Sequence, residues 1–152
     1  MKRCRTTGCA LLAALGMAFL IALAASGQSS TPSDAAALRV LDDQLDAYNA
    51  SDPIAWVGTL HFPYVRIAGS EVTVFPTAES YIPELSLKQH GWDYARWTQR
   101  RIVQSSVGKV HVVARFTRFQ ASGGAVDSFE GLYVIVLRHG RWGIIARSNI
   151  AL

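Results

Sequence analysis

Three chemically useful side chains lie close together in the sequence: His61, Tyr64 and Arg66. An imidazole exchanges a proton near neutral pH, a phenol donates a hydrogen bond to an oxyanion, and a guanidinium offers paired donors to an acidic group. This spacing predicts a site for a small anionic or carbonyl-bearing molecule, with His61 as general base and Tyr64 and Arg66 as ligand contacts. The alternative is that Val65 and Ile67 face the core, which leaves Arg66 in solvent and His61 at a helix C-terminus favoured by the dipole.

A second group of candidate residues lies in the segment Gly91–Trp97, which leads into a predicted strand. Here Asp93 could act as a carboxylate base and Trp92 as an apolar wall of a pocket, so the segment would form a lid. Trp56, which a preceding helix carries inward, completes the predicted ligand contacts. The alternative is a tryptophan-rich corner that plugs the open end of the fold, with Asp93 paired to Arg96.

Other polar groups in the chain do not predict a metal or cofactor site. Three aspartates share a helical stretch but have no histidine on their face, which favours a solvated surface: Asp42, Asp43 and Asp46. Three histidines are scattered without a metal-binding spacing: His90, His111 and His139. We therefore expect no bound metal and no cofactor.

The basic residues of the predicted strands do not indicate nucleic acid or phosphate binding. Arg100, Arg101, Arg115 and Arg118 are predicted to be outer-face charges or partners at a dimer rim, because no glycine-rich loop precedes a helix there. The whole chain of 152 residues has 15 Lys and Arg against 11 Asp and Glu, but three of the basic residues lie in the first five positions. The remainder is nearly neutral, which excludes the basic surface that nucleic acid requires.

The first 27 residues have the layout of a secretory signal peptide. A basic start is followed by an uncharged apolar run over residues 9–25 and then by small residues, which predicts a leader at 1–27, a linker at 28–33 and one domain at 34–152. We expect a secreted or periplasmic protein without membrane association after cleavage; the alternative is that the run is retained as an anchor. Cys4 and Cys9 lie inside the leader, so the mature chain would have no disulfide and no lipid anchor.

The remaining sequence predicts helices first and strands afterwards. Helices begin at Thr31–Pro32 and at Asp52–Pro53, where a capping side chain precedes proline. A hairpin turns at Gly69–Ser70, and a helical stretch with a break at Pro83 runs over residues 78–90. Four strands follow at about 96–106, 109–120, 126–138 and 141–150. This order predicts an α+β fold with a curved antiparallel sheet wrapped around the N-terminal helices.

Side-chain alternation predicts which faces of the sheet are buried. One face of the second long strand is apolar and should meet the helices, through Val110, Val112, Ala114 and Phe116. Residues 132–137 are apolar on both faces, so the outer face of the sheet should also be covered. We therefore predict a homodimer through the sheet.

This element order resembles the nuclear transport factor 2-like superfamily, in which a curved sheet and a long helix form a cone. The most similar stretches are LDAYNASDPIAWVGTLHFPYVRI and YVIVLRHGRWGIIARS. In a gapless register, the resemblance places the base of the superfamily's ketosteroid isomerases at Ala68 and their oxyanion-hole tyrosine at Gln44. Their protonated aspartate would fall near Tyr133 and Val134. None of these residues supplies that chemistry, so isomerase activity is not expected.

Three functions fit the sequence. The first is an exported domain that binds a small apolar or weakly acidic molecule in the cone. The second is a lyase, hydrolase or cyclase that uses His61 or Asp93 as general base. The third is a non-catalytic scaffold whose pocket is filled by its own side chains, among them Trp56, Trp92 and Trp142. A cavity of roughly 300 Å³ or more would separate the first two from the third.

Overall fold

The computed structural model describes residues 31–85 and 91–150, and its first element is helix α1 (Pro32–Ala50). The Thr31 hydroxyl accepts a hydrogen bond from the Asp34 N–H, and the Asp34 carboxylate accepts one from the Thr31 N–H at 2.8 Å. This reciprocal cap satisfies two of the backbone groups that a helix start leaves free. The helix thus begins at the predicted proline, inside the expected 28–33 linker. The leader, residues 1–27, lies outside the described residues.

Two short elements and a hairpin follow α1. Helix α2 (Pro53–Gly58) starts where the Asp52 carboxylate accepts from two backbone N–H groups, both at 2.9 Å. Strands β1 (Leu60–Ala68) and β2 (Glu71–Phe75) form the predicted hairpin. Helix α3 (Ala78–Tyr81) then passes into the 3-10 turn η1 (Ile82–Glu84) at the expected proline. The rest of the predicted helical stretch, with His90, lies outside the described residues.

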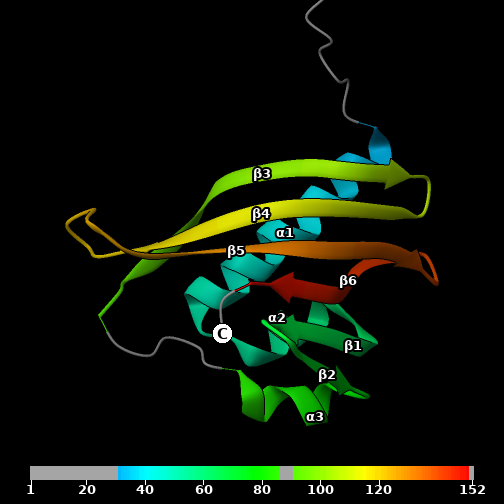
Figure 1. Ribbon diagram of the computed structural model, residues 1–152, viewed down its shortest axis with the longest axis horizontal. Coiled ribbons are helices and arrows are strands. Elements are labelled where there is room, and N and C mark those ends of the chain that lie inside the picture. The colour runs from blue at the N-terminus through cyan, green and yellow to red at the C-terminus, as the bar shows by residue number, and fades with distance from the viewer. Residues whose placement is uncertain (1–30, 86–90, 151–152) are drawn as a thin grey trace, which may run out of the picture.

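The sheet has six strands in the order β2-β1-β6-β5-β4-β3. Its last four strands form the predicted antiparallel meander: β3 (Tyr94–Ser106), β4 (Lys109–Phe119), β5 (Ala125–Arg138) and β6 (Arg141–Asn149). One pairing, between β1 and β6, is parallel, so the sheet is mixed. This pairing brings the N-terminal hairpin beside the end of the chain (Figure 1).

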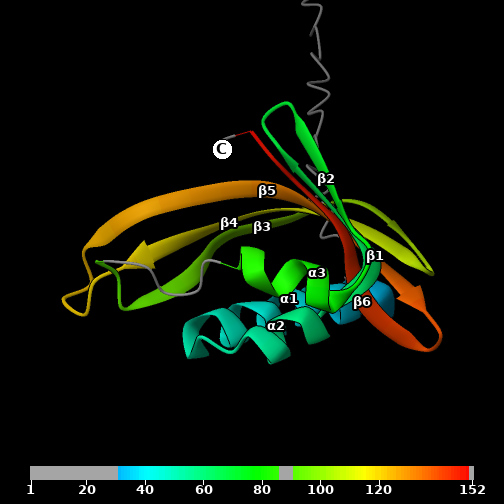
Figure 2. The same ribbon diagram turned by 90° about the horizontal axis from the view of Figure 1, so that it is seen from below.

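The curved sheet arches over the helices, which lie on its concave side (Figure 2). The predicted inner face of β4 is confirmed, because Val110, Val112 and Ala114 have no exposed surface and belong to one core cluster with Leu41 of α1. Burial of these side chains holds α1 against the sheet. No helix within residues 31–85 and 91–150 has the length and apolar character needed to cross a membrane.

The outer face of the sheet carries an apolar stripe that crosses several strands. In one cross-strand row Val74 of β2 pairs with Val65, Val65 with Ala146, and Ala146 with Val134 of β5. The neighbouring row is interrupted by one hydroxyl, since its members in order are Val72, Ile67, Ser148, Leu132 and Val113. Val72 is 65% exposed and Val74 is 57% exposed. We call these two rows the outer stripe.

Candidate functional site

The concave side of the sheet carries an open cavity of about 420 Å³. This volume lies in the range of sites that hold small molecules. Five aromatic side chains line it: Tyr48, Trp56, Tyr81, Phe116 and Phe129. Five charged side chains line it as well: Arg66, Glu71, Glu84, Arg118 and Arg147. Ala68, Leu85 and Asn149 complete the lining. A cavity lined by equal numbers of aromatic and charged side chains suits a ligand that has a flat apolar body and a charged group.

Arg147 on β6 differs from the other two arginines of this lining, because Arg66 and Arg118 each have an acidic partner. Its guanidinium carbon lies 5.4 Å from the centre of the Tyr133 ring and 5.8 Å from that of Phe116. Arg147 makes no ion pair with any described residue, and its buried Nε has no hydrogen-bond partner among them. Arg147 is half-buried, and a buried donor such as its Nε is costly to leave without an acceptor, so an anion placed here would gain a charge-assisted hydrogen bond.

Arg118 on β4, by contrast, is fully engaged by the protein. Its Nε donates to the Tyr48 hydroxyl at 2.8 Å, with a second donation to the same oxygen from Nη2, and its Nη1 bonds the Asp127 carboxylate at 3.2 Å. The guanidinium also lies over the Phe129 ring at 4.7 Å and the Trp92 ring at 5.4 Å. Its charge is therefore shared with Asp127, and it acts as a rigid, stacked part of the cavity wall.

Arg66 on β1 stands beside Arg147 in the sheet, because the two residues are direct partners in the parallel pairing. Its Nη2 lies 3.5 Å from the Glu84 carboxylate of η1, and its guanidinium is 5.2 Å from the centre of the Phe75 ring. Both partners of this ion pair are partly open to solvent. The mouth of the cavity therefore holds a loose ion pair next to the uncompensated Arg147.

Neutral phenols surround the arginines. Burial raises the pKa of Tyr81, and the positive charges of Arg147 and Arg66 oppose that rise. Burial likewise raises the pKa of Tyr64 and of Tyr133. These tyrosines are therefore protonated at neutral pH and add no negative charge near Arg147, and of the three Tyr81 lines the cavity.

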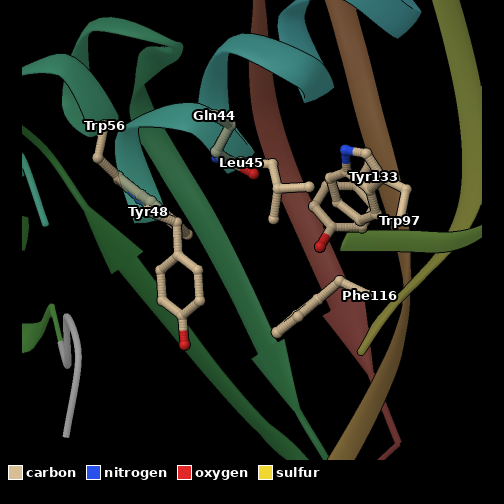
Figure 3. A pocket seen from close by; sticks show the side chains of 7 residues that line it. All are labelled: Gln44, Leu45, Tyr48, Trp56, Trp97, Phe116 and Tyr133. Atoms are coloured by element: carbon tan, nitrogen blue, oxygen red, sulfur yellow. The ribbon is translucent and has the colours of Figure 1, made fainter. Parts of the chain in front are cut away.

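A much smaller void lies next to this cavity, toward α1 (Figure 3). Its volume is about 10 Å³, so it holds no more than about one water molecule. Tyr48, Trp56 and Phe116 line both spaces. Four further side chains close the void on its other sides: Gln44, Leu45, Trp97 and Tyr133.

The structure places His61 away from the cavity. Its Nδ1 accepts a hydrogen bond from Arg141 Nη2 at 3.0 Å, and its Nε2 lies 3.1 Å from the Arg141 carbonyl oxygen. Because a guanidinium only donates, Nδ1 is the acceptor and Nε2 carries the proton. His61 is 8% exposed and serves to join β1 to the start of β6. It does not line the cavity, and the predicted role as general base has no substrate position beside it.

Asp93 and Trp92 take structural positions. The Asp93 carboxylate accepts the Ala121 N–H at 2.6 Å, so it closes the loop between β4 and β5 rather than pairing with Arg96. The Trp92 ring is buried and stacks on Tyr48 with centroids 4.9 Å apart. Trp92 thus supports the cavity wall through Tyr48, as in the plugged-corner alternative, and neither residue lines the cavity itself.

Of the other predicted ligand contacts, Arg66 and Trp56 do line the cavity. Tyr64 is on the predicted side of β1 but is 3% exposed, packed against Phe75 and Tyr81 behind the lining. Residues 31–85 and 91–150 contain no group of three or more His, Cys, Asp or Glu that could hold a metal ion. Asp42 bonds Arg100 at 2.6 Å instead.

Arg118 and Arg147 are the functional candidates that sequence reasoning missed. Arg118 was predicted as an outer-face charge, which is wrong, because it continues the inward alternation of Val112, Ala114 and Phe116. The signal was therefore present in the sequence. For Arg147 the sequence contains no such signal. An extra residue at Ile145 shifts the pairing of β6 with β5, and this bulge turns Arg147 to the inner face.

No protein-family model matches the chain, and no curated protein matches its sequence. Solved structures do match. A protein of unknown function with a cystatin-like fold from Nostoc punctiforme is 10% identical with a TM-score of 0.65, covering 78% of this chain and 91% of that one. An NTF2-like protein from Cytophaga hutchinsonii is 22% identical with a TM-score of 0.58, and the match covers 76% of this chain and 94% of that one. A ketosteroid isomerase-like protein from Erwinia carotovora atroseptica is 19% identical with a TM-score of 0.57, and the match covers 78% of this chain and 96% of that one.

These likenesses show the fold. The chain is an α+β protein with the curved sheet of the nuclear transport factor 2-like cone, as the resemblance in sequence implied. At these identities the fold carries no information about the reaction or the ligand.

Proposed function

We propose that this domain binds a small organic anion with a flat apolar body in its cone cavity. The observation that carries this proposal is Arg147, a guanidinium held between aromatic rings at the cavity wall with no acidic partner among the described residues. A carboxylate or similar group would take the free donors of Arg147 while the ligand body packs on Phe116 and its aromatic neighbours. The volume of the cavity favours this function over a scaffold filled by its own side chains.

The residues predicted as general bases do not support the enzyme alternative. His61 and Asp93, the predicted bases, are bonded to the protein outside the cavity. Ala68, where the resemblance implies the isomerase base, does line the cavity but cannot exchange a proton. The ketosteroid isomerase-like neighbour therefore does not lead us to propose isomerase activity.

Calorimetric titration with two matched probes tests this function. Naphthalene-2-carboxylate should bind, and naphthalene-2-methanol, which has the same ring without the charge, should bind at least tenfold more weakly. Arg147→Gln should weaken binding of the acid by about tenfold or more, since a hydrogen bond to a charged group is worth about 1.5–3 kcal/mol. The exposed Arg101 on β3 provides the control, because Arg101→Gln removes an equal charge far from the lining. Equal binding of acid and alcohol, or an unaffected Arg147→Gln variant, would contradict the proposal.

Two further properties stay proposals. We propose that residues 1–27 direct export, so that binding takes place in the periplasm or outside the cell, and that two copies associate through the outer stripe. The exposed valines Val72 and Val74 support the second of these, because an exposed patch of apolar side chains on a sheet marks a site of association.

A further inference from the structure

Glu84 occupies a position that a ligand could compete for. Its carboxylate is 3.5 Å from Arg66 Nη2, and both residues line the cavity. The distance is longer than a charge-assisted hydrogen bond, and side-chain exposures of 32% for Arg66 and 53% for Glu84 leave the pair open to solvent. An ion pair of this kind contributes little to stability, so an incoming anion can displace it.

Arg66 and Arg147 form a doubly basic wall. They are direct partners across β1 and β6, and neighbouring strands lie about 4.8 Å apart. Tyr81 lines the same cavity as both arginines, and their positive charges oppose the rise in its pKa that burial causes. One of these guanidinium groups has no acidic partner among the described residues, and the other holds only Glu84.

We infer that the preferred ligand is an aromatic molecule with two acidic groups, and that Glu84 is the internal carboxylate that the second acidic group displaces from Arg66. The first acidic group binds Arg147, so this inference rests on the proposed function. Glu84 is then a specificity-determining residue, because it competes with the second acidic group for Arg66 and so sets how much a diacid gains over a monoacid. It also ties η1 to the sheet until such a ligand arrives.

Glu71 gives a matched control within the same cavity. It lies on the lining at the start of β2, carries the same charge as Glu84 and makes no ion pair with a described residue. Glu71→Gln therefore measures the general effect of removing one negative charge from the cavity. Any additional effect of Glu84→Gln reports release of Arg66.

The experiment compares one monocarboxylate with two dicarboxylates by calorimetry: naphthalene-2-carboxylate, naphthalene-2,3-dicarboxylate and naphthalene-2,6-dicarboxylate. Glu84→Gln should strengthen binding of at least one dicarboxylate about two- to fivefold more than Glu71→Gln does, the range expected when a half-exposed competing ion pair is lost. The two variants should affect the monocarboxylate equally. In the double variant Arg66→Gln/Glu84→Gln the extra gain should disappear, because its source is the freed guanidinium of Arg66.

The outcomes separate the two proposals. If the native protein binds none of the three acids, the proposed function is wrong and this inference falls with it. If it binds the monocarboxylate while Glu84→Gln and Glu71→Gln act alike on every probe, the proposed function stands and the role of Glu84 is overturned. Weaker dicarboxylate binding by Glu84→Gln would also overturn it, since a purely structural Glu84 gives that result.

Discussion

His61 illustrates how a reactive residue type can be held in a structural junction. Its ring lies between the start of β1 and the start of β6, where Arg141 donates to Nδ1 and accepts from Nε2. Burial lowers the pKa of His61 below its ordinary value of 6.5, and the positive charges of Arg141 and Arg138 add to that effect. The neutral imidazole is therefore the form that holds this junction together.

This arrangement predicts a loss of stability in acid. With a lowered pKa in the folded state, His61 binds a proton more readily when the chain unfolds, so its contribution is complete above pH 6.5 and declines as the pH falls toward the folded-state pKa. Urea denaturation at pH 7.5 and 5.0 should show a smaller fall in the free energy of unfolding for His61→Gln than for the native protein. His111→Gln should also reduce the fall in the free energy of unfolding, because burial lowers the pKa of His111 as well. An equal pH dependence in the native protein and His61→Gln would contradict this role.

At the residue scale, sequence reasoning identified part of the candidate site. Arg66 and Trp56 were found because strand alternation and helix burial follow the local pattern of apolar residues. His61 and Asp93 were chosen for their chemistry, but their hydrogen bonds to Arg141 and to Ala121 come from segments far along the chain. Such long-range partners leave no mark in the local sequence.

At the element scale, the close contact of β6 with β1 depends on Gly143. A Cβ atom built on Gly143 would lie 2.8 Å from His61 Cδ2 and 3.0 Å from His61 Nε2. Only a residue without a side chain lets the imidazole lie against the β6 backbone and reach Arg141. Gly143, the second glycine of the Gly-Arg-Trp-Gly stretch, therefore has a packing role in this chain.

Gly143→Ala should destabilise the protein by about 1–3 kcal/mol, the usual cost of forcing a methyl group into filled space. Gly58, at the end of α2, is the matched control, because a Cβ there meets nothing within 4 Å. Gly58→Ala should leave stability unchanged or raise it by up to about 1 kcal/mol by restricting the unfolded chain. Thermal unfolding followed by circular dichroism measures both changes, and equal melting temperatures for the two variants would disprove the packing role of Gly143.

The elements themselves were largely predictable because their ends carry local signals. Thr31 and Asp52 precede prolines and cap α1 and α2 as expected, and glycines mark the turns between strands. The parallel pairing of β1 with β6 and the bulge at Ile145 were not predicted. Both depend on how distant segments meet, and the bulge decides that Arg147 faces the cavity.

At the scale of the whole molecule, the outer stripe is the surface best suited to a second copy. It continues from the exposed valines of β2 to Leu132 and Val134 of β5, which are only partly covered within one chain. Burying such a surface in a symmetric dimer would remove the apolar area from water. The cavity lies on the opposite face of the sheet, so association leaves it open.

A lysine in the stripe should therefore separate the copies. We expect the native protein to elute as a dimer in size-exclusion chromatography with light scattering, and Val72→Lys to shift it to the mass of a monomer. Ile54→Lys is the control, since Ile54 on α2 is 67% exposed, close to the 65% of Val72, but lies outside the sheet. A native monomer, or a Val72→Lys variant that stays dimeric, would refute association through this face.

The most direct measurement of the central claim is the ¹H–¹⁵N resonance of the Arg147 Nε–H group during titration with naphthalene-2-carboxylate. The resonance, assigned by its loss in Arg147→Lys, should move to saturation with the same affinity that calorimetry gives, while that of Arg101 stays in place. An Arg147 resonance that does not move while the acid saturates the protein would place the anion elsewhere. Absence of any binding at millimolar acid would contradict the proposed function as a whole.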